Sequence, residues 1–396
     1  MKLLFVLSRF PYPTDKGDKL RAYYQIKELS RTNDVYVICL ATKLPSEEQR
    51  HEVAKYCRLL EIIELTRVER AQNLFSALFA KEPFQVFYFR KKLMKERIAQ
   101  IITANNIDIC YVQLVRMGMN IPFELPVKYY LDYMDALSEG MNKRVNFSKW
   151  YEKFFVREEA RRLKWYEEKI AEHFDQYSII SQSDADCMPE SIKNKIHIIP
   201  NGVNEDFFIT RQNQEPKKYD IIFTGNMNYH PNIQACKYLV NQILPAIEAK
   251  GMNVNVCLAG TNPSSEVLAL KSDRVHVTGY VEDLKPYLHS SKIFVAPLFS
   301  GSGLQNKLLE AMAAGLPTIT TSLANKALKA KDKKEILICN EPQSFAAQII
   351  FLLNHPQEAA DMARLGRLYI RENFNWRACN ALLEKSLKTL FHTKNA

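Results

Sequence analysis

The amino-acid sequence predicts an α/β protein with two Rossmann-like domains, each built on a parallel β-sheet. Short apolar segments alternate with longer amphipathic segments through nearly all of the 396 residues. This alternation is typical of parallel βαβ units. A chain of this length also exceeds what one hydrophobic core usually organises, so we expect two domains.

The first series of elements fills the N-terminal half. An apolar strand over residues 3–7 is followed by a polar loop with Pro11, Pro13 and Gly17 and by an amphipathic helix over 19–31. The apolar stripe of this helix is expected to pack on the sheet. Further apolar runs predict strands at residues 35–40, 59–65, 109–112, 127–131, 177–180 and 196–199.

A turn at Pro200, Asn201 and Gly202 begins the passage to the second series, and the polar stretch 211–218 completes it. The last helix is expected over 375–393. Strands are predicted at residues 220–224, 254–259, 275–278, 293–296 and 318–321, with helices over 232–244 and 304–314.

Composition narrows the classes of function. The net charge of +10 suits an anionic partner such as a nucleotide or a phospholipid surface, whereas no recognisable module favours nucleic acid. The eight cysteines are widely spaced without a C-x-x-C pair, which favours a reducing compartment over disulfides or a zinc site. The N-terminal apolar run is too short for a signal peptide, and no run approaches a membrane span. We therefore expect a cytoplasmic protein, soluble or attached to the inner face of the membrane.

One helical run, over residues 142–172, is dense in aromatic and basic side chains, among them Trp150, Phe154 and Trp165. One interpretation is a solvated helix that packs one face on the first domain. The other is an amphipathic surface that meets a membrane or a lipid-linked substrate. Residues 89–95 form a second basic and apolar segment that allows the same two interpretations.

The segment V-A-P-L-F-S-G-S-G-L-Q-N-K-L-L-E-A-M over residues 295–312 leads from a strand through a glycine-containing loop into a helix. Backbone N–H groups and the positive end of the helix dipole favour an anion there. Lys307 lies one turn into the helix, and Glu310 projects from the same face. A diphosphate could bind to the lysine, and the glutamate could accept hydrogen bonds from a ribose diol. The alternatives are a plain turn and a surface ion pair. The segment lacks the third glycine of the dinucleotide fingerprint and the lysine-plus-hydroxyl ending of a P-loop.

Residues 297–317, P-L-F-S-G-S-G-L-Q-N-K-L-L-E-A-M-A-A-G-L-P, resemble the donor-site signature of family 4 retaining glycosyltransferases. More narrowly, the chain is similar to sugar transferases associated with exopolysaccharide and PEP-CTERM gene systems. The resemblance covers nearly the whole chain. It includes the opening of the C-terminal domain at residues 223–227 and 231–232, the hinge at 198–203, the nucleobase site at 278–281 and the helix that crosses back at 374–376.

This resemblance implies a GT-B architecture, in which two Rossmann-like domains face each other across a cleft. The implied domains are residues 1–198 on the acceptor side, 199–373 on the donor side and a returning helix over 374–396. It also implies transfer of a hexose or related sugar from a nucleoside diphosphate sugar to a saccharide or polyprenyl-linked acceptor. No metal and no cofactor are expected. A binding protein that keeps the pocket without catalysis is the alternative. A nicotinamide-dependent oxidoreductase is disfavoured because residues 8–17 lack the fingerprint glycines.

The same resemblance implies that Glu310 binds the ribose and that Lys307 binds the diphosphate. It also implies that the backbone at residues 279–281 binds the base. Gly17 matches a glycine loop that approaches the β-phosphate and the acceptor, and Arg21 could add a cation. Many family members have Glu at the position of Ser302 and an Arg/Lys pair after the first strand of the second domain, where Gly225 is here followed by N-M-N-Y-H. Lys307 is therefore expected to carry a larger share of phosphate neutralisation. The residues assigned to the donor are Gly17, Gly225, Gly279, Tyr280, Val281, Gly301, Ser302, Gly303, Leu304, Lys307 and Glu310.

Two carboxylates in the first domain are further catalytic candidates, beside Lys307 and Arg21. Asp132 and Asp135 follow a predicted strand, and the carboxyl ends of parallel strands are where ligands bind. One of them could accept the proton of the acceptor hydroxyl or position that hydroxyl. Alternatively, either could cap the following helix. Gln113 and Arg116 follow another strand at the same edge.

Overall fold

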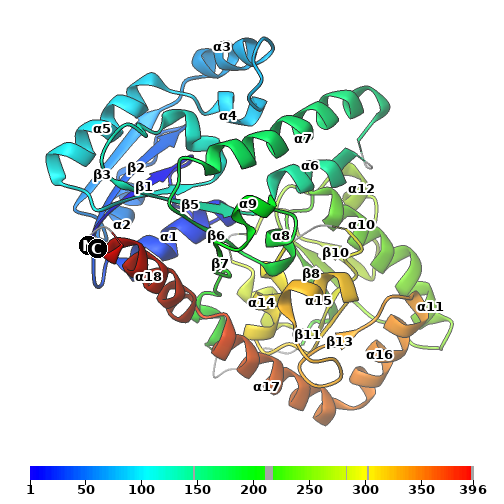
Figure 1. The fold of residues 1–396 in the computed structure, drawn as a ribbon. Helices are drawn as coiled ribbons and strands as arrows, with labels where there is room; N and C mark the ends of the chain where they lie inside the picture. The colour runs from blue at the N-terminus through cyan, green and yellow to red at the C-terminus, as the bar shows by residue number, and fades with distance from the viewer. Residues whose placement is uncertain (146–147, 210–216, 282, 301–302, 394–396) are drawn as a thin grey trace. The chain divides into compact units, whose positions relative to one another are not determined.

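The computed structural model describes residues 1–145, 148–209, 217–281, 283–300 and 303–393. The chain divides into two compact units, shown in Figure 1. The first unit joins Met1–Pro200 to Cys379–Ala396, and the second comprises Asn201–Ala378. The first division thus falls two residues after the expected position, and the return to the first unit falls inside the last helix.

The first unit contains a parallel sheet of seven strands in the order β3-β2-β1-β4-β5-β6-β7. Its central strands are buried on both faces, which is why their sequences read as nearly continuous apolar runs. The strands are β1 (Lys2–Leu7), β2 (Asp34–Ala41), β3 (Leu59–Glu64), β4 (Ile109–Gln113), β5 (Lys128–Met134), β6 (Gln176–Ile179) and β7 (Ile196–Ile198).

Helices cover both faces of this sheet. Alternate residues of β1 point to opposite faces, so Phe5 packs with α1 and the C-terminal α18, whereas Val6 packs with α5 and α7. Asn380 of α18 donates to the backbone oxygen of Tyr24 of α1 at 3.3 Å, and Figure 1 shows the two helices together. The helices are α1 (Gly17–Leu29), α2 (Glu47–Ala54), α3 (Arg67–Ala77), α4 (Phe84–Tyr88), α5 (Lys92–Asn105), α6 (Leu137–Val145), α7 (Trp150–Ala171), α8 (Gln182–Ala185), α9 (Glu190–Lys193) and α18 (Trp376–His392).

The second unit repeats the plan with six parallel strands in the order β10-β9-β8-β11-β12-β13. The strands are β8 (Tyr219–Thr224), β9 (Val256–Ala259), β10 (Val275–Val277), β11 (Ser291–Ala296), β12 (Thr318–Thr320) and β13 (Leu337–Ile338). The helices are α10 (His230–Tyr238), α11 (Leu244–Glu248), α12 (Ser265–Leu268), α13 (Lys285–His289), α14 (Asn306–Ala313), α15 (Ser322–Leu328), α16 (Pro342–Asn354) and α17 (Pro356–Asn373).

The predicted α/β class with two parallel sheets is confirmed. Three local predictions were wrong. The single long helix over 142–172 is two helices, α6 and α7. Strand β5 continues three residues beyond its predicted end at residue 131, and the short β13 was missed. In both sheets the strand order reverses next to the first strand, between β1 and β4 and between β8 and β11. Ligands of open α/β sheets bind at the carboxyl ends of strands at this switch point.

All eight cysteines are unpaired thiols, six of them buried. Among the described residues, no helix is long and apolar enough to cross a membrane. No cluster of three or more His, Cys, Asp or Glu side chains in the described part of the chain is arranged to hold a metal ion.

Candidate functional site

The switch point of the second unit lies where β8 ends at Thr224 and β11 ends at Ala296. The loop after β11 is held by side chains of neighbouring elements. Thr320 donates to the Ala296 backbone oxygen at 2.8 Å, and Ser300 donates to the Gln234 side chain of α10 at 2.8 Å. The loop then reaches α14, whose N-cap residue supplies no side-chain cap to the first turn. The start of α14 therefore keeps the character of an anion site.

Lys307 lies in the first turn of α14 and is half-buried. Its Nζ donates to Asn232 Oδ1 at 2.5 Å and stands 5.3 Å from the centre of the Phe223 ring. Burial lowers the pKa of Lys307 to about 8, against the opposing effect of Glu310. The ammonium is thus taken out of water and held by a neutral amide oxygen, so an anion beside it would be bound strongly.

Glu310 follows one turn later on α14 and is also half-buried. Burial raises the pKa of its carboxyl to about 7, while Lys307 acts to lower it. In the described part of the chain, no ion pair joins these two residues. The structure therefore does not show the surface ion pair that the sequence allowed. It shows a cation and a carboxyl group spaced along one helix, both partly withdrawn from water.

Asn232 completes this arrangement and was not predicted as a site residue. Its side chain is buried, donates to the Asn226 backbone oxygen at 2.8 Å and accepts from Lys307. The glycine at 225 makes room for this contact, because a Cβ there would approach Asn232 Nδ2 to 2.7 Å and Lys307 Cε to 3.4 Å. The sequence signal was the Pro231-Asn232 pair at the start of α10, which we used only for the family resemblance.

One hydroxyl next to this cluster lacks a hydrogen bond. Thr224 Oγ1 at the end of β8 is buried and has no partner among the described residues. A buried polar atom without a partner is costly in a folded protein. It marks a position where a ligand or water could satisfy the hydroxyl.

The other residues of the second unit that were assigned to the donor lie in that unit or outside the described residues. Gly279 follows β10 with φ +73°, and Tyr280 after it is exposed. Leu304 packs against the core of the unit. Val281 is half-buried. Gly301 and Ser302 lie outside the described residues.

Arg21 and Asp132 are placed differently from the expectation. Both side chains are fully buried in the first unit and form a bidentate ion pair, with Arg21 Nε to Asp132 Oδ2 at 2.6 Å and Nη2 to Oδ1 at 3.1 Å. Tyr111 and Ser178 also donate to Asp132, at 2.7 and 2.9 Å. Strand β5 extends past Asp132, which fixes the carboxylate inside the sheet. In this structure the Arg21 guanidinium is therefore directed at Asp132, and the Asp132 carboxylate is closed off from solvent.

Asp135 separates from Asp132 because β5 loses its register with β6 between Asp132 and Met134. Met134 has φ +62°, and Asp135 leaves the strand half-buried. Burial and then Asp184 raise the pKa of Asp135 to about 7, against Arg21 and Arg116. No hydrogen bond of the described residues uses its carboxylate, so it caps no helix. A carboxyl that titrates near neutrality suits proton transfer.

A pocket of about 540 Å³ lies at the carboxyl ends of β1 and β2 in the first unit. Four cations line it, of which Arg9 pairs with Asp18 and Lys19 with Asp15. Gly17, the first residue of α1, borders this region, and a Cβ at Gly17 would meet nothing within 4 Å. The other two cations are Lys16 and Lys43.

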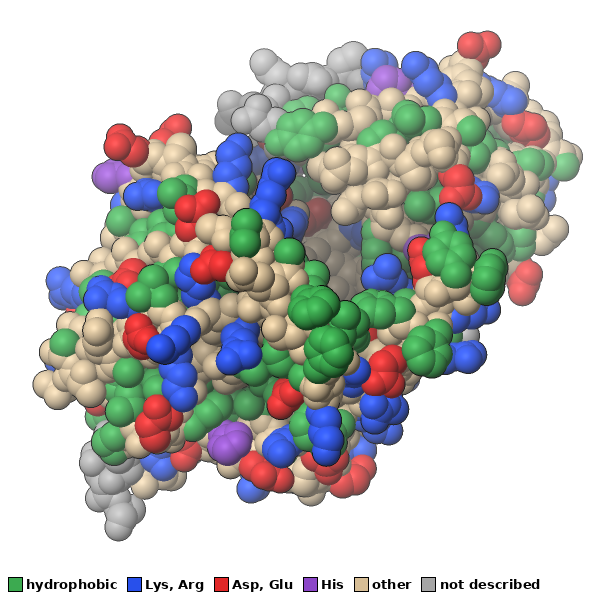
Figure 2. All heavy atoms as spheres, turned by 90° about the horizontal axis from the view of Figure 1, so that it is seen from above, with side chains coloured by type: hydrophobic (Ala, Val, Ile, Leu, Met, Phe, Trp, Pro, Cys, Tyr) green, Lys and Arg blue, Asp and Glu red, His purple; other side chains and the backbone are tan. Residues whose placement is uncertain are grey.

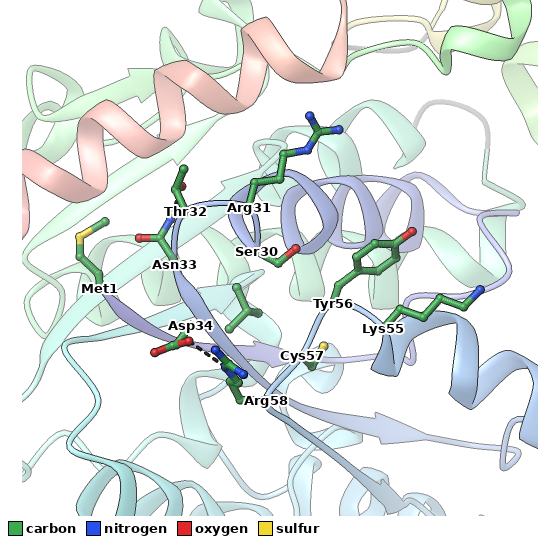
Figure 3. Close-up of a pocket in the computed structure, with 11 residues that line it drawn as sticks. Met1, Ser30, Arg31, Thr32, Asn33, Asp34, Lys55, Tyr56, Cys57 and Arg58 are labelled. Carbon is green, nitrogen blue, oxygen red and sulfur yellow. Dashed lines mark hydrogen bonds and ion pairs between the residues drawn. The ribbon is translucent and has the colours of Figure 1, made fainter.

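A second pocket, of about 430 Å³, lies at the opposite edge of the same sheet (Figure 3). Its lining includes Met1, Tyr56 and the ion pair of Asp34 with Arg58 at 2.8 Å. These residues surround the amino ends of β1 and β2. Because ligands of such sheets bind at the carboxyl edge, this second pocket lies at the edge of the sheet where a ligand is not expected.

Residues 218–355 match the family model described as glycosyl transferases group 1. The match contains Asn232, Lys307 and Glu310 and lies within the second unit. Over the whole chain, an uncharacterized 44.6 kDa protein in the cps region of Klebsiella pneumoniae is 21% identical, covering 94% of this chain and 96% of its own length.

Two solved structures show the fold. Sucrose-phosphate synthase from Thermosynechococcus elongatus superposes with a TM-score of 0.71 at 15% identity, covering 99% of this chain and 100% of its own. HepE of Anabaena in complex with UDP has a TM-score of 0.65 at 13% identity, and the match covers 98% of this chain and 100% of HepE. The chain has the GT-B fold. Together with the family match, the GT-B fold supports glycosyl transfer.

Proposed function

We propose that this GT-B protein is a retaining glycosyltransferase of the family 4 type. It transfers a hexose or related sugar from a nucleoside diphosphate sugar to a saccharide or polyprenyl-linked acceptor, without a metal, in surface polysaccharide or glycan biosynthesis. The observation that carries the proposal is the spacing of Lys307 and Glu310 on α14, beside the switch-point loop of the unit that matches the family model.

The chemistry follows from where charge develops. The bond between the anomeric carbon and the diphosphate breaks, a bond to the acceptor oxygen forms, and the hydroxyl proton leaves. Negative charge grows on the leaving diphosphate, so a fixed ammonium and helix-terminal amides lower the barrier most effectively there. Lys307 supplies that ammonium, and Glu310 accepts hydrogen bonds from the ribose diol. The structure of HepE with UDP is consistent with a nucleotide donor in this fold.

On the acceptor side, the proposal uses the first unit. The pocket lined by Arg9, Lys16, Lys19 and Lys43 suits an acceptor that carries a phosphate or diphosphate. Asp135, with its pKa near 7, is the residue we assign to receiving or positioning the acceptor hydroxyl.

The test is a thermal-shift screen against UDP-, GDP-, ADP- and dTDP-sugars, followed by an assay for release of the nucleoside diphosphate. A donor at about 100 times its Kd should raise the Tm by roughly 5 °C or more. Donor cleavage, slow alone and faster with an acceptor, is expected of a transferase. Stabilisation without any cleavage would instead identify a binding protein that lacks catalysis. If no sugar nucleotide stabilises the protein, the proposed donor site is wrong.

Donor affinity is expected to depend on pH in two directions. The carboxyl of Glu310, with its pKa raised to about 7, must lose its proton to accept from the ribose, so binding weakens as pH falls through 7. The ammonium of Lys307, with its pKa lowered to about 8, must keep its proton, so binding weakens as pH rises through 8. Titration calorimetry with the stabilising sugar nucleotide should show the lowest Kd between pH 7 and 8.

Each limb of this pH profile has its own control. About one pH unit beyond either value, the Kd should be about tenfold higher. In Glu310→Gln the acidic limb should disappear while the alkaline limb remains, and in Lys307→Ala the reverse should hold. A Kd that does not change between pH 6 and pH 9 would show that neither group contacts the donor.

A further inference from the structure

Helix α3 of the first unit exposes its hydrophobic side chains instead of burying them. Only Ala77 of this helix is buried, whereas Phe75 is exposed. In the turn that follows, Leu78 is exposed and Phe79 is 80% exposed. The rings of Phe75 and Phe79 lie 5.5 Å apart, so they form one patch. A surface helix normally turns its apolar side to the core, and α3 does the opposite.

The first turns of α7 present a second group of exposed aromatic side chains. Trp150 is 85% exposed and Phe154, one turn later, is 81% exposed. Tyr151 is exposed as well. The helix begins at Trp150, so these residues occupy its first two turns. The side chains farther along α7 include buried ones, whereas these three aromatic side chains at its start face solvent.

Helices α3 and α7 belong to one packed body. Arg162 of α7 donates to the Ala77 backbone oxygen at the end of α3 at 2.9 Å, and its guanidinium lies 4.8 Å from the Phe84 ring of α4. Phe155 packs on the same Phe84 ring at 4.7 Å. Figure 2 looks down on the side of the molecule that carries α3 and α7 and shows hydrophobic side chains interspersed with Lys, Arg, Asp and Glu. We name as the aromatic surface Val68, Leu74, Phe75, Leu78, Phe79, Trp150, Tyr151, Phe154 and Phe155.

Cations surround this surface. Residues 149–164 contain six Lys and Arg against three Glu. Within this stretch Arg161 and Arg162 pair with Glu158. Around the aromatic surface the described residues include exposed cations that take part in no ion pair, namely Arg67, Lys81, Lys149, Arg157 and Lys164.

We propose that the aromatic surface docks the protein on a bilayer that contains anionic phospholipids. Trp and Tyr are enriched where protein meets the headgroup region, and an apolar face bordered by cations binds anionic lipid. A second copy of the chain fits less well. A two-fold contact through this surface would bring the cationic borders together, and like charges facing each other oppose association.

The docking deepens the proposed function and rests on it only for the identity of the acceptor. Helix α3 begins three residues after β3 ends at Glu64, at the carboxyl edge of the first sheet. The pocket lined by Lys43 opens at the end of the neighbouring β2. Docking through α3 would therefore bring the acceptor edge of this unit to the lipid headgroups, as a lipid-linked acceptor requires.

Co-sedimentation with vesicles tests the proposal. The full chain should bind vesicles of phosphatidylcholine with phosphatidylglycerol, bind pure phosphatidylcholine at least tenfold more weakly, and lose affinity as salt rises. Phe75→Ser with Phe79→Ser, and separately Trp150→Ser with Phe154→Ser, should each reduce the partition coefficient about tenfold or more. The matched control is Leu323→Ser with Leu368→Ser, which removes two exposed hydrophobic side chains from the second unit and should bind as wild type.

Circular dichroism of each variant would show that the fold persists, which is expected because the replaced side chains are exposed. Lys307→Ala should bind vesicles like wild type, so a failed donor site and a failed docking surface give different results. The proposal is overturned if the aromatic variants bind vesicles as the control does. It is also overturned if wild type ignores vesicles and forms, in sedimentation velocity, a dimer that the aromatic variants lose.

Discussion

Lys307→Ala is expected to reduce the rate of sugar transfer by about 100- to 1,000-fold, the range seen when one fixed donor to a developing anion is removed. The ammonium is held half-buried by Asn232 at 2.5 Å, in a place where few water molecules could replace it. Its effect on the leaving diphosphate should therefore be larger than that of a lysine on the surface. Steady-state assays of nucleoside diphosphate release, with kcat and KM measured separately, provide the check.

The fold should survive this change. Burial disfavours the charged form of Lys307, as its lowered pKa shows, so removing the group should leave the Tm unchanged or slightly higher. Lys326→Ala, at an exposed lysine on α15, is the matched control and should retain full activity. Asn232→Asp should also impair transfer, because a carboxylate would pair with the ammonium and compete with the donor phosphates. Full turnover in Lys307→Ala would refute the assignment.

Both sheets could be predicted because parallel strands buried on both faces leave nearly continuous apolar runs bounded by turn residues. Lys307 and Glu310 could be placed on one helix face because they lie three positions apart in the sequence. Asn232 could not be found in this way. Its contact with Lys307 joins α10 to α14 across 75 positions of the chain, and no local pattern reports such a contact.

The errors have the same origin. Asp132 and Asp135 lie three positions apart after an apolar run. The sequence does not show that β5 extends past Asp132, so that Asp132 lies in the strand and Asp135 lies beyond its end. Likewise, the resemblance suggested that Arg21, just after the glycine loop at Gly17, could add a cation there, and it gave no sign of the pair with Asp132, which lies 111 positions away in the chain. The sequence analysis assigned no element to residues 67–77, so the exposed hydrophobic face of α3 was not anticipated.

Asp132→Ala is expected to destabilise the first unit by about 3–5 kcal/mol. The side chains of Arg21 and Asp132 are both fully buried, so removing the carboxylate leaves a guanidinium without its counter-charge in the interior. Ser178 also loses its acceptor, and the Tyr111 hydroxyl keeps only Gln25 Oε1 at 3.1 Å. Unfolding in urea, followed by far-UV circular dichroism, should show a lower midpoint for the first unit. Asp34→Asn breaks the exposed pair of Asp34 with Arg58 and, as the matched control, should leave the midpoint unchanged.

A double variant separates a structural pair from a ligand contact. Arg21→Met with Asp132→Leu removes both charges and should recover much of the stability that either single change loses, because no uncompensated charge stays buried. Arg21→Met alone should lower the urea midpoint. Any loss of donor binding should be no larger than the loss of folded protein, so the folded molecules should bind the donor with unchanged affinity. If Arg21→Met instead weakened sugar-nucleotide binding at an unchanged midpoint, the arginine would contact the phosphate, and the buried pair would not be its resting partner in the complex.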